Sequence, residues 1–254
     1  MPQQSTVTVA GQVIDVLTGG SGPNLLVLHR DTGRFGWTAL HAALAKTHTV
    51  IAPALPGYDG SARPEFLRNV TDLSALVGYL MDELGLGPCA VLGLGYGGWI
   101  AAEIATRSPG RVTRLILQAP MGTRPDEGLI FDQFLIDAEE YIAYGFANKD
   151  AYEATKGIYG EERPRVIDSN REMTTRIAWK PAMFNPGIRH LLPGLKSPAL
   201  VIWGDGDRIV PKSCADIYAA AIPGARLAVM PGVGHYADLE APDALAGLIT
   251  DFLK

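Results

Sequence analysis

Short apolar segments rich in branched side chains alternate along this chain with longer segments of helical period. Residues 24–29 form an almost continuous apolar run, which is the pattern of a buried strand. Residues 69–86 instead repeat apolar side chains at the spacing of a helix with one buried face. The same reasoning predicts strands at 6–10, 13–17, 49–54, 90–94, 112–118, 199–203 and 226–230, and helices at 37–45, 97–107 and 243–253. This alternation is typical of an α/β fold, a mostly parallel central sheet of about eight strands with helices on both faces.

The pattern changes between the predicted strands at 112–118 and 199–203. Residues 121–195 show amphipathic helical periodicity, several aromatic side chains and clusters of charge, but no convincing strand. We therefore expect residues 1–120 and 196–254 to form one core, with residues 121–195 inserted as a helical cap. The chain has no internal repeat or linker, so we interpret the cap as an excursion from the core rather than a second domain.

Composition and charge limit the classes of partner. The 254 residues are 47% hydrophobic and 19% charged, which suits a single enzyme-sized domain. The expected partner is a small-molecule substrate. A net charge of -5 without runs of like charge argues against nucleic acid and membrane surfaces as partners. No signal-like N-terminus or membrane-length apolar window is evident, so we predict a cytoplasmic protein. Cys89 and Cys214 are too few for a disulfide framework or a metal cluster. We expect no metal and no cofactor, and a homodimer is left open.

Residues 91–98 read Val-Leu-Gly-Leu-Gly-Tyr-Gly-Gly, directly after a predicted strand and before a predicted helix. The sequence fits a nucleophile elbow, a sharp turn that in the motif G-x-S-x-G presents a serine hydroxyl. Here Gly93 and Gly97 stand at the outer glycine positions, and Gly95 stands where the serine would be. Glycine occupies strained backbone geometry at little steric cost, so the turn is expected to form without its nucleophile.

Three further groups of residues accompany the elbow in a fixed order. They are Leu28-His29 before a loop containing Gly33, Pro56-Gly57-Tyr58 through Gly60-Ser61, and Gly204-Asp205-Gly206-Asp207 through Val210-Pro211 followed by Gly234-His235. Together the four resemble the α/β-hydrolase fold superfamily, and the chain looks like a divergent member that lacks the nucleophilic serine. The family's catalytic triad runs nucleophile, acid, histidine. The resemblance places these roles at Gly95, Asp207 and His235.

An imidazole held by a carboxylate is a competent general base near neutral pH. His235 with Asp207 could supply such a base. Two alternatives stay open: the pair is an inherited structural hydrogen bond, or Asp205 is the partner of His235.

The oxyanion region also departs from the family's pattern. Members typically have His-Gly where this chain has His29-Arg30, and the next position, which normally lends a backbone N–H to the oxyanion, is Asp31. Tyr96 would lend the second N–H. If the carboxylate of Asp31 faces the pocket, it opposes a developing oxyanion and can act as a second acid or base. The alternative is that Arg30 and Asp31 pair on the surface.

Aromatic residues of the cap and the elbow helix suggest an apolar or ring-containing substrate, although most aromatic side chains of this kind pack into a core. The candidates for the pocket are Trp99, Tyr141, Tyr144 and Trp179. His41 and His48, around the first predicted helix, are expected to be exposed.

We therefore predict a cofactor-independent enzyme that uses His235 and Asp207 as a general base without an acyl-serine intermediate. Hydrolysis by activated water is favoured slightly, because hydrolysis dominates the family. Proton abstraction from the substrate, as in a lyase, isomerase or cyclase, is the close alternative. A catalytically silent ligand-binding protein or pseudoenzyme is the third.

Overall fold

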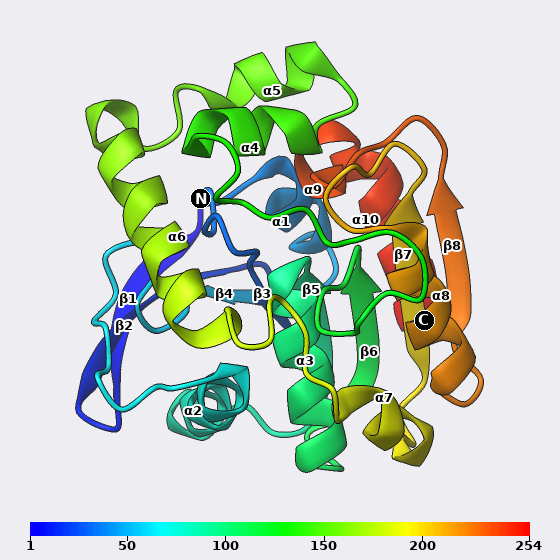
Figure 1. Ribbon diagram of the computed structural model, residues 1–254. Coiled ribbons are helices and arrows are strands. Elements are labelled where there is room, and N and C mark those ends of the chain that lie inside the picture. The colour runs from blue at the N-terminus through cyan, green and yellow to red at the C-terminus, as the bar shows by residue number, and fades with distance from the viewer.

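Eight strands form one sheet at the centre of the structure, a computed structural model that describes residues 1–254 (Figure 1). In spatial order they are β1 (Gln3–Val9), β2 (Gln12–Gly19), β4 (Thr49–Pro53), β3 (Asn24–Leu28), β5 (Cys89–Leu94), β6 (Val112–Gln118), β7 (Ala199–Gly204) and β8 (Arg226–Met230). β1 and β2 pair in antiparallel fashion, and β2 is antiparallel to β4. Every neighbouring pair from β4 to β8 is parallel. The predicted fold class is confirmed.

Helices cover both faces of this sheet. Those of the core are α1 (Ala39–Leu44), α2 (Val70–Glu83), α3 (Tyr96–Arg107), α8 (Lys212–Ala221), α9 (Ala237–Glu240) and α10 (Pro242–Leu253). Those between β6 and β7 are α4 (Ala138–Gly145), α5 (Lys149–Thr155), the 3₁₀ turn η1 (Gly160–Glu162), α6 (Arg163–Ala178), α7 (Ile188–Leu191) and the 3₁₀ turn η2 (Leu192–Gly194). No strand interrupts this second set. In Figure 1, α4 and α5 lie beyond the ends of β5 and β6, and α6 continues from them along one side of the molecule.

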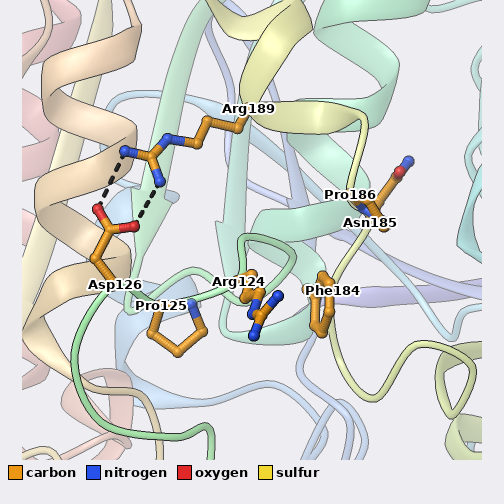
Figure 2. A pocket seen from close by; sticks show the side chains of 7 residues that line it. All are labelled: Arg124, Pro125, Asp126, Phe184, Asn185, Pro186 and Arg189. Carbon is orange, nitrogen blue, oxygen red and sulfur yellow. Dashed lines mark hydrogen bonds and ion pairs between the residues drawn. The ribbon is translucent and has the colours of Figure 1, made fainter.

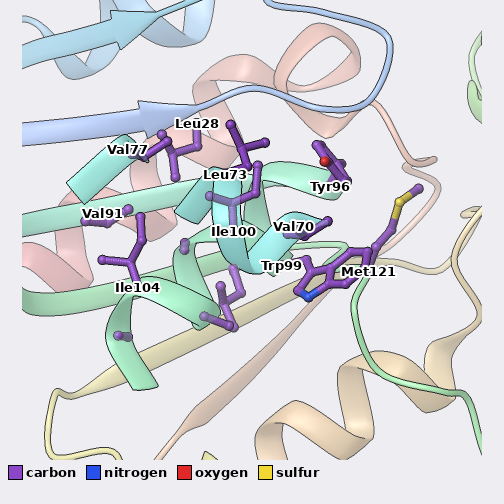
Figure 3. Close-up of a cluster of buried hydrophobic side chains, with 14 of the residues drawn as sticks. Leu28, Val70, Leu73, Val77, Val91, Tyr96, Trp99, Ile100, Ile104 and Met121 are labelled. Carbon is purple, nitrogen blue, oxygen red and sulfur yellow. The ribbon is translucent and has the colours of Figure 1, made fainter. Parts of the chain in front are cut away.

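The strands divide the core into two apolar clusters, because successive side chains of a strand point to opposite faces. In β3, Leu26 and Leu28 join the cluster beneath α2 and α3, whereas Leu25 and Val27 join the one beneath α1 and α10. Figure 3 shows the first cluster, with Leu28 beside side chains of α2 and α3.

The cap rests on a smaller apolar cluster of its own. Phe35 and Tyr236 come from loops of the core, while Ile142, Phe146 and Ile167 come from the cap. The rings of Phe146 and Tyr236 stack with centroids 4.6 Å apart and planes 8° from parallel. Tyr236 follows His235 directly, so this contact fixes the cap against the loop that carries the candidate base.

None of the helices combines the length and the apolar composition that a bilayer crossing requires.

The expectation that His41 and His48 are exposed is wrong: both are buried, at 2% and 8% relative exposure. The Nδ1 atom of His41 accepts a hydrogen bond from the backbone N–H of Thr38 at 3.1 Å and so helps to cap α1. The ring of Trp37 stacks on the imidazole. Burial, followed by the nearby charge of Arg34, lowers the pKa of His41 to about 3.

This burial predicts a pH dependence of stability. Below pH 6.5 the histidine is protonated in the unfolded state, whereas the folded His41 stays neutral. The unfolded state therefore binds more protons, and the free energy of unfolding decreases as the pH falls. We expect His41 to remove up to about 1.4 kcal/mol of unfolding free energy per pH unit below that point. Urea denaturation between about pH 5 and pH 7 measures the slope. His41→Gln should flatten it, and His190→Gln, at an exposed position, should not. An equal slope in all three proteins would contradict the prediction.

Candidate active site

A sharp turn joins β5 to α3. Gly95 forms its tip at φ +53° and ψ -110°, a region that favours glycine. The backbone N–H of Gly95 donates to the carbonyl of Gln118 at 2.8 Å, and its own carbonyl accepts from the N–H of Met121 at 3.1 Å. The turn is thus held by the end of β6 and the chain that follows it. It has the backbone form of the predicted elbow.

The start of α3 also lies close to the sheet. A Cβ atom added to Gly97 would stand 2.2 Å from the carbonyl oxygen of Leu28 at the end of β3. Only glycine permits this approach. It brings the loop after β3, residues 29–31, beneath the first turn of α3.

His235 and Asp207 lie together, each with a fully buried side chain. The Nδ1–H of His235 donates to Oδ2 of Asp207 at 2.9 Å. The other oxygen, Oδ1, accepts from the backbone N–H groups of Ile209 and Val210 at 2.8 and 2.9 Å. Three donors therefore fix the carboxylate, which in turn fixes the tautomer of the imidazole and leaves Nε2 with a free lone pair. Asp205, the alternative partner, accepts from the N–H of Gly232 instead.

The imidazole faces the tip of the elbow. A Cβ atom built on Gly95 would lie 2.9 Å from Nε2 of His235 and 3.3 Å from its Cε1. His235 thus stands against the space that a side chain at position 95 would enter. Nε2 has no hydrogen-bond partner in the chain, although it is buried.

Arg30 and Asp31 do not pair on the surface; this alternative is wrong. Both are buried, and they point to different partners. Arg30 donates to Asp238 at 2.7 Å and to Oε1 of Gln118 at 3.2 Å. Its guanidinium also stacks 4.4 Å above the ring of Tyr236. Arg30 therefore has a structural role, because it joins the loop after β3 to β6 and α9.

Asp31 is fully buried with only one side-chain partner. Its Oδ2 accepts from the hydroxyl of Tyr141 in α4 at 2.9 Å, and its Oδ1 has no partner. Burial and the charge of Asp31 hold the pKa of Tyr141 well above its usual value, so the phenol keeps its proton and donates. Asp31 is thus an acceptor aimed into the interior beneath the cap.

Tyr96 contributes two groups at the start of α3. Its backbone N–H occupies the first position of the helix and has no partner within it. Its buried hydroxyl lies near that of Tyr58, and burial raises its pKa well above the usual value. His235 faces Gly95, which precedes Tyr96 in the chain, and the charge of Asp31 contributes to the raised pKa of Tyr96, so the three side chains are near one another. Buried polar atoms without a partner, as in His235 and Asp31, are uncommon in native proteins, and such a cluster is typical of a functional site.

His29 belongs to the framework and not to the reactive cluster. Its Nδ1–H donates to the carbonyl of Arg30 at 2.7 Å, and its Nε2 accepts from the N–H of Leu55 at 2.9 Å. Burial lowers its pKa. Both nitrogens are occupied by backbone groups, so the prediction of a pocket role for His29 is corrected.

The four predicted pocket aromatics separate into two groups. Tyr141 and Trp179 line a small cavity of about 50 Å³, which we name the cap cavity. The other residues of its wall are Ile130, Phe131, Asp132, Gln133, Ala182 and Met183. Tyr144 packs against Phe131 and Arg208 outside it. Trp99 lies in the large apolar cluster beside Met121 (Figure 3), and its indole N–H donates to the buried Glu103 at 3.1 Å. Trp99 is therefore a core residue.

Neither cysteine offers a substitute nucleophile. Both are buried and free. Burial raises the pKa of the Cys89 thiol to about 11 and that of Cys214 to about 12. Neither forms a thiolate near neutral pH.

Comparisons with known proteins identify the family. A family model described as "Alpha/beta hydrolase family" matches residues 21–248, most of the chain. The chain belongs to this family. Among curated relatives, it is 28% identical over 282 residues to a 2-hydroxymuconate semialdehyde hydrolase of Pseudomonas putida, covering 99% of this chain and 96% of the relative.

A second curated relative and a solved structure are also similar to this chain. The chain is 27% identical over 248 residues to the dihydrolipoyllysine-residue acetyltransferase component of an acetoin cleaving system from Cupriavidus necator. This match covers 92% of the chain but only 64% of that relative's length. A solved structure of a meta-cleavage product hydrolase from Pseudomonas fluorescens superposes with a TM-score of 0.84 at 24% identity, covering 98% of this chain and 97% of the other.

A much larger cavity of this family member, of about 560 Å³, lies elsewhere (Figure 2). Its walls come from the chain after β6 and the residues before and within α7. Arg189 pairs with Asp126 through two hydrogen bonds of 2.6 and 3.1 Å, as the dashed lines show. The cavity contains none of the predicted site residues. Size alone therefore does not locate the site.

Two residues of the site escaped sequence analysis. Gln118, at the end of β6, accepts from Arg30 and donates its side-chain N–H to the carbonyl of His235 at 3.1 Å. Asp238 neutralises Arg30. A polar residue that ends an apolar strand was a usable signal for Gln118. Asp238 carried no signal beyond its place close after His235.

The buried pair of Arg30 and Asp238 predicts a large effect on stability. Arg30→Met leaves the carboxylate of Asp238 buried without its cation, and the removal of one partner from such a pair typically costs about 3–5 kcal/mol of unfolding free energy. Chemical denaturation measures this. Arg189→Met, which breaks the exposed pair with Asp126, is the matched control and should change stability far less. A small effect of Arg30→Met would show that Asp238 reaches another donor or is protonated.

Proposed function

We propose that this chain is a cofactor-independent enzyme that acts on a small, fairly apolar substrate through His235 and Asp207, without an acyl-serine intermediate. One observation carries the proposal. Nε2 of His235, oriented by Asp207, is unpartnered and faces an elbow whose tip, Gly95, has no side chain. A base therefore lies beside a position whose residue has no side chain to form a covalent bond with the substrate.

Hydrolysis by activated water is the first candidate reaction. Nε2 takes a proton from water as the water oxygen bonds to the substrate's carbonyl carbon. Asp207 supports the imidazolium that forms, and the imidazolium returns the proton to the leaving group as the carbonyl re-forms. The backbone N–H of Tyr96 is available to the developing oxyanion. The relatives named as hydrolases support this reaction class.

Proton abstraction from the substrate is the second candidate, and Asp31 favours it. A carboxylate with a free oxygen opposes a developing oxyanion nearby, but it accepts a hydrogen bond from a substrate hydroxyl and can exchange a proton with it. His235 would then remove a proton from carbon, and Asp31 would assist at oxygen. This pair suits elimination, isomerisation or cyclisation.

A generic ester tests the first candidate. We expect the wild-type protein to hydrolyse 4-nitrophenyl acetate without a burst and without an acetylated species in the intact mass of quenched samples. His235→Ala should lose at least about 100-fold in rate, the usual range for a general base, while staying folded. Asp205→Asn is the control and should keep its rate, because Asp205 does not contact His235. An acetyl-enzyme in the wild type would refute the mechanism.

Deuterium exchange separates the second candidate from the first. In D₂O, the α-protons of acetophenone should exchange faster with the wild type than with His235→Ala if the base abstracts protons from carbon. NMR intensities give the rate. Ester hydrolysis without exchange favours activated water, and exchange without hydrolysis favours the lyase or isomerase reaction. Failure of both, with intact folding, would favour a silent ligand-binding protein.

The role of Asp31 can be tested by restoring the serine. In Gly95→Ser the new side chain must displace His235 slightly. The oxyanion that develops on the probe when this serine attacks it would form near the Asp31 carboxylate. We expect slow labelling by a fluorophosphonate. Gly95→Ser/Asp31→Asn should label about tenfold to a hundredfold faster, because removing the charge restores a favourable site for the oxyanion. Gly95→Ser/Asp205→Asn is the control, and equal labelling of all three would mean that Asp31 does not act on the oxyanion.

A further inference from the structure

The cap cavity has mainly apolar walls, with two polar residues, Asp132 and Gln133, among them. Ile130, Phe131, Tyr141, Trp179 and Met183 supply apolar surface. Gln133 is buried, at 4% relative exposure, yet its side-chain Oε1 has no hydrogen-bond partner. A buried amide oxygen left without a partner costs free energy, which a bound donor recovers.

Gln133 is also held in position. Arg171 of α6 donates through Nη2 to the backbone carbonyls of both Gln133 and Ile136. The guanidinium lies over the ring of Phe134, 5.0 Å from its centroid. The backbone that carries Gln133 is therefore tied to the longest cap helix, which holds this residue at the wall of the cavity.

The cavity lies between the surface and the reactive cluster. Trp179 lines it and is 41% exposed, with its ring in edge contact with Phe134 at a centroid distance of 5.6 Å. On the inner side, Tyr141 both lines the cavity and donates to Asp31. Tyr141 is thus the wall that the cavity and the reactive cluster share.

The cavity is too small to hold a ring unless one of its wall residues moves. About 50 Å³ accommodates one or two water molecules, whereas an apolar cavity that binds benzene measures about 150 Å³. A ring can enter only if a wall residue yields. Tyr141 is suited to this, because a substrate donor that reaches Asp31 replaces the hydrogen bond that its hydroxyl gives up.

We propose that the cap cavity is the subsite for an uncharged ring that carries a hydroxyl or N–H, and that Oε1 of Gln133 selects for this donor. The carboxylates of Asp132, in the cavity wall, and of Asp31, behind Tyr141, disfavour a carboxylate on the ligand. The assignment rests on the proposed function, since it takes the cluster around His235 as the place of reaction. Ligand binding to the cap cavity and catalytic turnover are nevertheless measured separately, so either proposal can be refuted without the other.

Phenol, a donor, and anisole, a ring of similar shape with an acceptor only, test the subsite. We expect the wild type to prefer phenol, measured as the ratio of the two dissociation constants by ligand-observed NMR. Gln133→Met should reduce this preference about fivefold to tenfold, the usual contribution of one hydrogen bond. Gln3→Met, at an exposed position, should leave the ratio unchanged. An unchanged ratio in Gln133→Met would overturn the proposal.

A measurement on the wild type covers the case in which Gln133→Met does not fold. Phenol should shift the NMR signals of the Gln133 side-chain amide, and anisole should shift them much less. Equal shifts, or none with phenol, would overturn the subsite. His235→Ala should bind phenol as the wild type does. If it does, but no protein shows turnover, the subsite stands and only the proposed function fails.

Discussion

The site depends on how closely α3 approaches the sheet. Gly97 lets the helix start against the carbonyl of Leu28, and the turn at Gly95 is hydrogen-bonded to the end of β6. These contacts bring the ends of β3, β5 and β6 to one point, which is where parallel sheets place ligands. Asp31 and the N–H of Tyr96 reach that point only because this approach is short. His235 reaches it from the other half of the core.

Charges buried around this point are satisfied to different degrees. Asp207 has three donors, and Arg30 has a carboxylate, an amide oxygen and an aromatic face. Asp31 has a single donor, from the cap. Burying a carboxylate is costly unless donors compensate for lost water, so the incomplete set of donors at Asp31 lowers stability. Proteins typically accept such a cost at functional sites, which supports Asp31 as a residue that meets the substrate.

The features that could be predicted are those encoded in short stretches of sequence. The strands and the elbow follow from apolar runs and glycine spacing, and β8 begins and ends as expected. The bond between His235 and Asp207 was reached through the family resemblance, and the structure contains it. The partners of Arg30 and Asp31 could not be predicted, because Asp238 and Tyr141 are distant in sequence and meet them only in the folded structure. Adjacent charges in a loop are usually exposed, and here the cap overrides that tendency. His41 and Trp99 were misplaced for the same reason: burial is decided by tertiary packing, which periodicity does not encode.

Closure by the cap gives the proposed chemistry its setting. His235, Asp31 and Tyr96 are all fully buried, and electrostatic interactions strengthen where water is excluded. The same closure means that a substrate must displace part of the cap to enter. Displacing Tyr141 would cost free energy, because its hydroxyl is the only side-chain donor to Asp31. A ligand with a hydroxyl or N–H group can replace the hydrogen bond from Tyr141. An apolar ligand without a donor leaves the buried Asp31 carboxylate without a hydrogen bond. Substrate selection and access to the base would therefore be set by one hydrogen bond between the cap and the loop after β3.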